Sequence, residues 1–458
     1  MAIVVTGYFM LVVDMSIVSV ALPAISRGLS FSAASLSWIT TAYTLSYAGF
    51  LMFGGRLADL YGRRRIFLGG LALFTGASLA AAFSPDAGAL VAARFVQGFG
   101  AAMAAPSALA LIMDLYPEGP RRRRALGAFQ SVAGSGGAFG LLLGGLLTSW
   151  FGWEAIFLVN LPIGLVIVGL GLRFLPRAAP GAHGRRFDLA GAATITAALA
   201  LLIYTAAETA QRGWLTVPTL GGLAGAVALL VLFGLIEHRS ADPLLPLRIP
   251  RNPVVRRANL RGLLLAGAFL SAFTFIALDD EEVLGHSPAR SGLALLPVAL
   301  MIVLVGRIGP RLVARFGIRP LALMAPVVTA AGLFWLAASS SSDFLTMRLM
   351  PELLIGFGAA VGFLVNMLAA TNGAEPHERG VVSALQSTAQ QVGISVGLAT
   401  FVSLAAARAT HLVATHQAAG TVALHDGFRL AFLAGGIAAL ASAALAIEPG
   451  RRVAHHAA

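Results

Sequence analysis

The sequence predicts an all-α integral membrane protein with fourteen transmembrane helices, and three observations lead to this prediction. The first is composition, because 58% of the 458 residues are hydrophobic and only 11% are charged, whereas soluble domains carry about 25% charged residues. The second is a series of fourteen apolar runs, each near the ~20 residues that a membrane-spanning helix needs. The third is a repeat that relates the first part of the chain to the last part.

The apolar runs follow one another along the chain, and short polar segments separate them. They lie at residues 3–25, 37–57, 66–83, 88–113, 125–149, 154–174, 188–207, 218–237, 259–278, 291–314, 320–338, 344–370, 381–406 and 427–447. Each run predicts one helix. Because their number is even, both chain termini are expected on the same side of the membrane.

The repeat is carried by two short segments that lie 255 residues apart. Residues 56–62 and residues 311–317 both begin with an Arg-Leu pair and both end in glycine. Runs one to six therefore correspond to runs nine to fourteen, and runs seven and eight form an insertion. We expect a six-helix bundle at 1–175, a linker with two inserted helices at 176–258, a second six-helix bundle at 259–448 and a tail at 449–458.

The arginines lie mostly in alternate loops, for example at residues 63–65, 121–124 and 311–319. Since cytosolic loops are enriched in basic residues, this asymmetry predicts a cell-membrane protein with both termini in the cytosol. The net charge of +12 resides in short loops between apolar runs. The lipid bilayer with its anionic headgroups is therefore the expected partner, and nucleic acid is not.

The loop after the second run, residues 55–65, reads GRLADLYGRRR. Its short length forces two antiparallel helices, for which glycine permits a tight turn and aspartate can accept hydrogen bonds from the next helix. The spacing resembles the helix 2–3 loop signature of the major facilitator superfamily. The resemblance implies a gating role for a loop that latches two halves, with the residues Gly55, Asp59, Gly62, Arg63 and Arg64.

The first run contains a carboxylate, Asp14, in the segment DMSIVSVALP at residues 14–23. This segment resembles the helix 1 motif of the 14-helix drug:proton antiporter branch, with Ser16 in place of threonine and Ser19 in place of asparagine. A carboxylate within a transmembrane helix is costly in lipid and indicates function. Asp14 could carry a proton across, or it could form a structural ion pair. The repeat-related position is Phe269, so no duplicate of Asp14 is expected.

The fourth run contains Arg94, the only basic residue deep in the first half, and Gln97 follows within one helical turn. The segment LVAARFVQGFGAA resembles the helix 4 motif of the family. A buried guanidinium needs a partner, and Asp14 is the natural candidate, which makes the two residues the expected proton-coupling pair. The alternative is that Arg94 extends to the outer interface of the membrane.

The fifth run has glycines four residues apart, which form a smooth face where a neighbouring helix can approach closely. These are Gly136, Gly140, Gly144 and Gly145. The pattern resembles the antiporter motif of helix 5, with Leu141 where the family has proline. Ordinary helix packing explains the glycines equally well.

Polar residues in other runs are candidates for a substrate cavity. Besides Ser16 and Gln97 they are Asn160, Arg348, Glu352, Asn366, Gln386 and Gln390. Arg348 and Glu352 are four apart, so we expect them to form an ion pair on one helical face or to line the cavity.

An acidic cluster follows the ninth run, on the predicted outer side, and comprises Asp279, Asp280, Glu281 and Glu282. These residues could attract protons to the outer mouth of a transporter. A solvated loop is the commoner fate of such a run of charges, and it is the interpretation favoured here.

The chain shows no phosphate-binding loop, no Ser-His-Asp set and no dinucleotide-binding glycines, and the histidine spacing matches no zinc motif. With no cysteine present, we expect no enzyme, no metal and no cofactor. The resemblance covers nearly the whole chain and implies a facilitator fold. It implies a monomeric secondary transporter that exports small amphipathic, drug-like molecules in exchange for protons by alternating access. The alternatives are a uniporter or importer of a small metabolite, and a non-transporting membrane sensor.

Overall fold

The structure is a computed structural model that describes residues 1–29, 38–117, 119–176, 188–240, 242–286, 288–339, 348–373, 375, 378–415 and 420–447. Within these ranges the chain is helical and no strand occurs. The predicted tail at 449–458 and residues 177–187 of the predicted linker lie outside the described residues.

The first half of the chain forms helices that coincide with the first six predicted runs. They are α1 (Ala2–Leu29), α3 (Trp38–Tyr61), α4 (Arg63–Ala82), α5 (Ala87–Leu115), α6 (Pro120–Phe151), α7 (Ala155–Leu158) and α8 (Asn160–Phe174). The short helix α7 continues into α8, and together they make the sixth span.

Two inserted helices and a short third one follow. They are α9 (Leu189–Arg212), α10 (Val217–Arg239) and α11 (Arg248–Arg251). The helix α9 packs against α3 of the first half and against α17 of the second half. Thr196 of α9 donates a hydrogen bond of 2.9 Å to the backbone oxygen of Gly49 in α3. The insertion therefore lies against both halves of the protein.

The last part of the chain forms the helices that correspond to runs nine to fourteen. They are α12 (Pro253–Leu278), the π-helix η1 (Asp279–Val283), α13 (Pro288–Ala294), α14 (Leu296–Phe316), α15 (Ile318–Ala338), α16 (Met350–Asn372), α17 (Arg379–Ala414) and α18 (Thr421–Ala444).

Twelve spans in the described residues are long and apolar enough to cross a membrane. The remaining two predicted runs coincide with α3 and α6, which have 24 and 32 residues and are thus also long enough to span. The predicted fold class, an all-α membrane protein with fourteen transmembrane helices, is confirmed.

The repeat is visible in the backbone. Gly62, between α3 and α4, has φ 95°, and Gly317, between α14 and α15, has φ 78°. This left-handed conformation favours glycine, so both segments turn in the same way between two antiparallel helices. We call the end of the protein that carries these two turns the Gly62 end.

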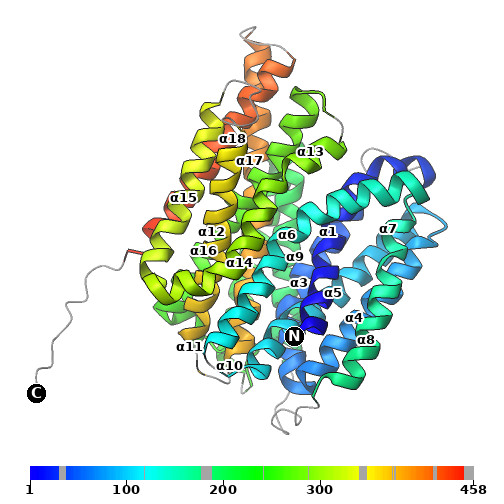
Figure 1. The fold of residues 1–458 in the computed structure, drawn as a ribbon, viewed down its shortest axis with the longest axis vertical. Helices are drawn as coiled ribbons and strands as arrows, with labels where there is room; N and C mark the ends of the chain where they lie inside the picture. Colours follow the sequence, from blue (N-terminus) through cyan, green and yellow to red (C-terminus); the bar gives the residue numbers. More distant parts are fainter. Residues whose placement is uncertain are drawn as a thin grey trace, which may run out of the picture.

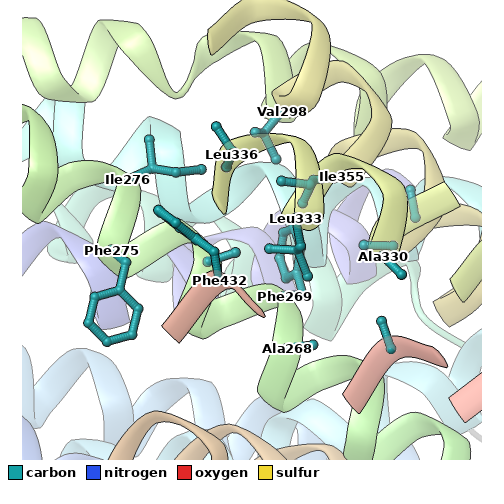
Figure 2. Packing of buried hydrophobic residues seen from close by; sticks show 14 of the residues in the cluster. Ala268, Phe269, Phe275, Ile276, Val298, Ala330, Leu333, Leu336, Ile355 and Phe432 are labelled. Atoms are coloured by element: carbon teal, nitrogen blue, oxygen red, sulfur yellow. The ribbon is translucent and has the colours of Figure 1, made fainter. Parts of the chain in front are cut away.

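In Figure 1 the helices α1 to α8 and the helices α12 to α18 form two groups that lie side by side, and α6 and α14 meet at the boundary between them. The second group has its own apolar core. Figure 2 shows Phe275, Ile276, Val298, Leu333 and Phe432 converging from α12, α14, α15 and α18. Lipid tails are as apolar as these side chains, so the hydrophobic effect does not drive membrane helices together. Close packing of this kind holds them together instead.

Candidate functional site

A buried ion pair joins the first helix to the fourth long helix of the first half. Nη1 of Arg94 in α5 lies 2.5 Å from Oδ2 of Asp14 in α1, and each residue is only 1% exposed. The structure thus brings together the two residues of the expected pair. The alternative that Arg94 extends to the membrane interface is wrong, because its guanidinium is enclosed by α1, α3 and α5.

Three polar side chains complete a hydrogen-bond network around this pair. Gln97 accepts a bond of 2.9 Å from Arg94 and donates one of 2.7 Å to Ser78 Oγ. Asn160 donates to Oδ1 of Asp14 at 2.8 Å and to Ser78 Oγ at 3.4 Å. The network therefore ties together α1, α4, α5 and α8.

The network contains residues that sequence reasoning did not identify. Ser78 is an isolated serine in an apolar helix, and nothing in its neighbourhood distinguishes it from the serines that only bond to their own helix backbone. The ring of Tyr43 lies 4.3 Å from the guanidinium carbon of Arg94, close enough for a cation–π interaction. Asn160 was a candidate for the substrate cavity, and the structure places its amide on Asp14.

The loop between α3 and α4 is held by its arginines. Arg63 pairs with Asp59 at 3.3 Å and with Asp114 of α5. Arg64 donates a hydrogen bond of 2.6 Å to the backbone oxygen of Leu172 in α8. The predicted gating residues Arg63 and Arg64 thus bind helices within the first half.

Two other residues of this loop region face the second half. The carboxylate of Asp59 lies beside Gly380, where an added Cβ would come within 2.7 Å of Oδ1. A Cβ added to Gly55 would come within 2.9 Å of the side chain of Ala384. Both contacts involve α17, so the Gly62 end of the first half touches the second half here.

The glycine face of α6 packs against α1. A Cβ at Gly136 would lie 2.5 Å from Val12. A Cβ at Gly140 would collide with the hydroxyl of Ser16, and one at Gly144 would lie 2.5 Å from the backbone oxygen of Ile17. Gly145 is different, because its nearest neighbour, Val20, is at an ordinary 3.8 Å. Ser16 itself donates to the backbone oxygen of Gly136 at 3.2 Å.

The acidic cluster does not form a solvated loop. Asp279 and Asp280 are each 4% exposed, and the favoured interpretation is wrong for these two residues. They lie in η1, which continues α12 without a break, so their side chains remain within the bundle. Only Glu281 and Glu282 are exposed.

Arg348 is the partner of the buried acids. It pairs with Asp279 and lies 3.9 Å from Asp280, while His425 Nδ1 of α18 is 2.8 Å from the other oxygen of Asp279. The expected ion pair between Arg348 and Glu352 is wrong. Arg348 precedes the first residue of α16, so the spacing of one α-helical face does not apply to it.

The remaining cavity candidates lie in separate places of the second half. Asn366 accepts a hydrogen bond of 2.9 Å from Nε of Arg261. Gln386 lies beside Gly262 of α12, as does Gln390. In the part of the chain that the structure describes, Glu352 is fully buried and neither of its carboxylate oxygens has a hydrogen-bond partner.

Each half therefore pairs an aspartate of its first long helical segment with an arginine at its fourth long helix, within α5 in the first half and two residues before α16 in the second. Asp14 and Arg94 form the pair in the first half, and Asp279 and Arg348 form it in the second. Phe269 occupies the repeat-related position of Asp14, so the second pair is not a duplicate of the first. The second aspartate lies ten residues further along its helix than the repeat predicts.

Two related helical bundles with buried charge pairs define a multi-pass membrane protein of the transporter class. Residues 4–398 match the family model described as Major Facilitator Superfamily, and the chain belongs to this family. It is a transporter of small molecules and not an enzyme.

The comparisons with known proteins find export and resistance proteins. The chain is 39% identical to the cephamycin export protein CmcT of Amycolatopsis lactamdurans, over 87% of this chain and 83% of the relative. It is 37% identical to the puromycin resistance protein pur8 of Streptomyces alboniger, over 87% and 80%. Methylenomycin A resistance protein of Streptomyces coelicolor is 32% identical, over 86% and 82%.

Solved structures share the fold. The human organic anion transporter MFSD10 superposes with a TM-score of 0.68 at 16% identity, over 97% of this chain and 98% of that chain. The proton:xylose symporter XylE superposes with a TM-score of 0.64 at 15% identity, over 96% and 93%.

Proposed function

We propose that this protein exports small amphipathic molecules in exchange for protons by alternating access. Support for export comes from relatives at 32–39% identity that are described as export or resistance proteins. Support for proton coupling comes from Asp14, a carboxylate sealed inside the first half. This single residue carries the proposal, since a protein that only spans the membrane gains nothing from a buried charge.

The hydrogen bonds that Asp14 accepts indicate what the binding of a proton to this residue would change. Oδ2 accepts from Arg94 and Oδ1 accepts from Asn160, so both oxygens act as acceptors, as they do in the ionised carboxylate. A protonated acid has a hydrogen to donate, and neither Arg94 nor the Asn160 amide nitrogen can accept it. Both oxygens can still accept, but the negative charge is gone, so binding a proton weakens both bonds, above all the charge-assisted bond from Arg94.

The weakening of these bonds has structural consequences. Arg94 is buried, and an unpaired buried charge costs several kcal/mol. The two bonds join α1 to α5 and α1 to α8, so protonation favours a new arrangement of these three helices. We propose that this rearrangement opens the first half toward one side, and that release of the proton restores it.

The halves would rock about the middle of the membrane, as the fold allows, and the contact between Asp59 and α17 would hold the Gly62 end closed. We propose that the protein acts as a monomer in the cell membrane, with both termini in the cytosol. It would use no cofactor, since the proton gradient supplies the energy. The membrane potential adds about 2.3 kcal/mol per charge per 100 mV.

The test is transport by the purified protein in sealed vesicles with an imposed pH gradient. Puromycin and a cephamycin, the compounds named in two relatives, are the first probes. Accumulation that needs the gradient supports the proposal. Equal uptake with and without a gradient would indicate a uniporter, and failure to move any compound of a wider toxic panel would indicate a sensor.

A further inference from the structure

A cavity of about 700 Å³ lies where the two halves meet, between α6 and α14. The two helices are in close contact beside it, because a Cβ added to Gly127 of α6 would lie 2.7 Å from the backbone oxygen of Gly306 in α14. The cavity receives Arg124 from α6 and Arg307 and Arg311 from α14. Both halves thus contribute a guanidinium to it.

In the part of the chain that the structure describes, no carboxylate compensates the charge of these three arginines. The described residues that line the cavity include no aspartate or glutamate. Among the described residues, no ion pair joins Arg124, Arg307 or Arg311 to a carboxylate. By contrast, Arg63, Arg94 and Arg348 each form an ion pair with an aspartate. Three guanidinium groups around one cavity attract an anion, and phosphate suits their planar fork of donors.

The rest of the wall indicates what kind of anion fits. Val5, Val132, Val303 and Ala314 line the cavity together with two prolines. Arg124 lies near the start of α6 and Arg311 near the end of α14, at the Gly62 end, where a spanning helix reaches the headgroup layer, and Arg307 lies one turn deeper in α14. An occupant with one anionic group and an apolar body satisfies both kinds of wall.

We infer that the cavity is a binding site for an acidic phospholipid. The phosphate bridges Arg124 of one half and Arg307 and Arg311 of the other, and the acyl chains lie along the apolar wall. Basic pockets between transmembrane helices bind acidic headgroups in this way. A lipid that touches both halves stabilises the arrangement in which α6 and α14 are close, and so biases the conformational equilibrium.

The experiment is native mass spectrometry of the intact, detergent-solubilised protein titrated with phosphatidylglycerol or phosphatidylcholine. Wild type is expected to retain one phosphatidylglycerol in preference to phosphatidylcholine. The double variant Arg307→Gln/Arg311→Gln is expected to bind it about 30-fold more weakly, as two lost arginine contacts predict. The matched control is Arg121→Gln/Arg315→Gln, which removes two arginines at the same end that do not line the cavity.

Two outcomes would overturn the inference. Equal weakening in both double variants would mean that the lipid responds to overall charge and not to the cavity. Displacement of the lipid by glycerophosphoglycerol at equal concentration would show that the site takes a soluble anion. Equal melting temperatures of the two double variants in phosphatidylcholine micelles ensure that folding does not explain a difference.

Discussion

The carboxylate of Asp59, near the end of α3, lies against Gly380 in the first turn of α17. The N-terminus of a helix carries a partial positive charge, so an anion there stabilises by about 0.3–1 kcal/mol and up to ~2 kcal/mol when partly buried. The contact therefore favours the conformation in which the Gly62 ends of the two halves touch.

The first prediction follows from this contact. Asp59→Ala should insert normally but transport slowly, because the conformation with the Gly62 end closed becomes less populated. A single cysteine at Ala384, which is buried in the same interface, should react about fivefold faster with a maleimide in this variant. Asp114→Ala is the matched control, since Asp114 binds the same Arg63 from within the first half. If Asp59→Ala transported at the wild-type rate, the loop would serve only to set the orientation of the protein in the membrane.

The second prediction concerns the glycine face. Gly140→Ala should destabilise the protein by about 1–3 kcal/mol through overpacking, because the new methyl group collides with Ser16 and the backbone of α1. Gly145→Ala should be tolerated, since its nearest neighbour is 3.8 Å away. Both changes raise helix propensity equally. Thermal unfolding in detergent measures the difference in stability between the two variants. Equal melting temperatures would contradict the close packing of Gly140 against α1.

The third prediction concerns the charge cluster of the second half. Arg348→Ala leaves Asp279 and Asp280 buried without their guanidinium, which should cost about 3–5 kcal/mol. Arg408→Ala removes an exposed pair with Asp426 and should cost at most about 1 kcal/mol. Unfolding of both variants in detergent is the measurement. Similar stabilities would mean that solvent reaches the cluster around Asp279.

Part of this architecture is predictable from sequence. The fourteen helices follow from hydropathy, and the equivalent turns at Gly62 and Gly317 follow from a simple repeat. The pairing of Asp14 with Arg94 is also predictable, because two isolated charges in apolar helices have few other partners. In each case the residues that determine the feature can be recognised from their immediate neighbours in the sequence.

The second charge cluster could not be predicted in the same way. Four consecutive acids resemble a loop, and the burial of the first two depends on Arg348 and His425, which lie 69 and 146 residues beyond Asp279. The π-helix η1 adds to the difficulty, because it carries the helix on through the acidic run. Ser78 was missed for a similar reason, since its role depends on how α4 is rotated toward α5 and α8.

The fourth prediction concerns topology. The chain has no cysteine, so single cysteines can be introduced without background. Ala87 is the first residue of α5, and Gly119 lies beyond the other end of that helix, directly before α6. A membrane-impermeant maleimide added to intact cells should label Ala87→Cys and leave Gly119→Cys unlabelled until the membrane is opened. The reverse pattern would invert the proposed orientation.

The fifth prediction concerns the buried carboxylate. Asp14→Asn preserves the shape of the side chain and removes the titratable proton. The variant should still exchange labelled for unlabelled substrate across the membrane, because exchange needs no net proton movement. Because Arg94 loses its counter-ion, the double variant Asp14→Asn/Arg94→Gln serves as a control in which the buried network is neutral.

The most direct test of the proposed coupling is a pH jump applied to vesicles that contain wild type, Asp14→Asn or the double variant. Substrate uptake against its own gradient is followed with time. Wild type should accumulate substrate, and both variants should equilibrate it without accumulation while their exchange activity persists. Undiminished proton-driven accumulation by Asp14→Asn would contradict the role of Asp14 as the proton carrier.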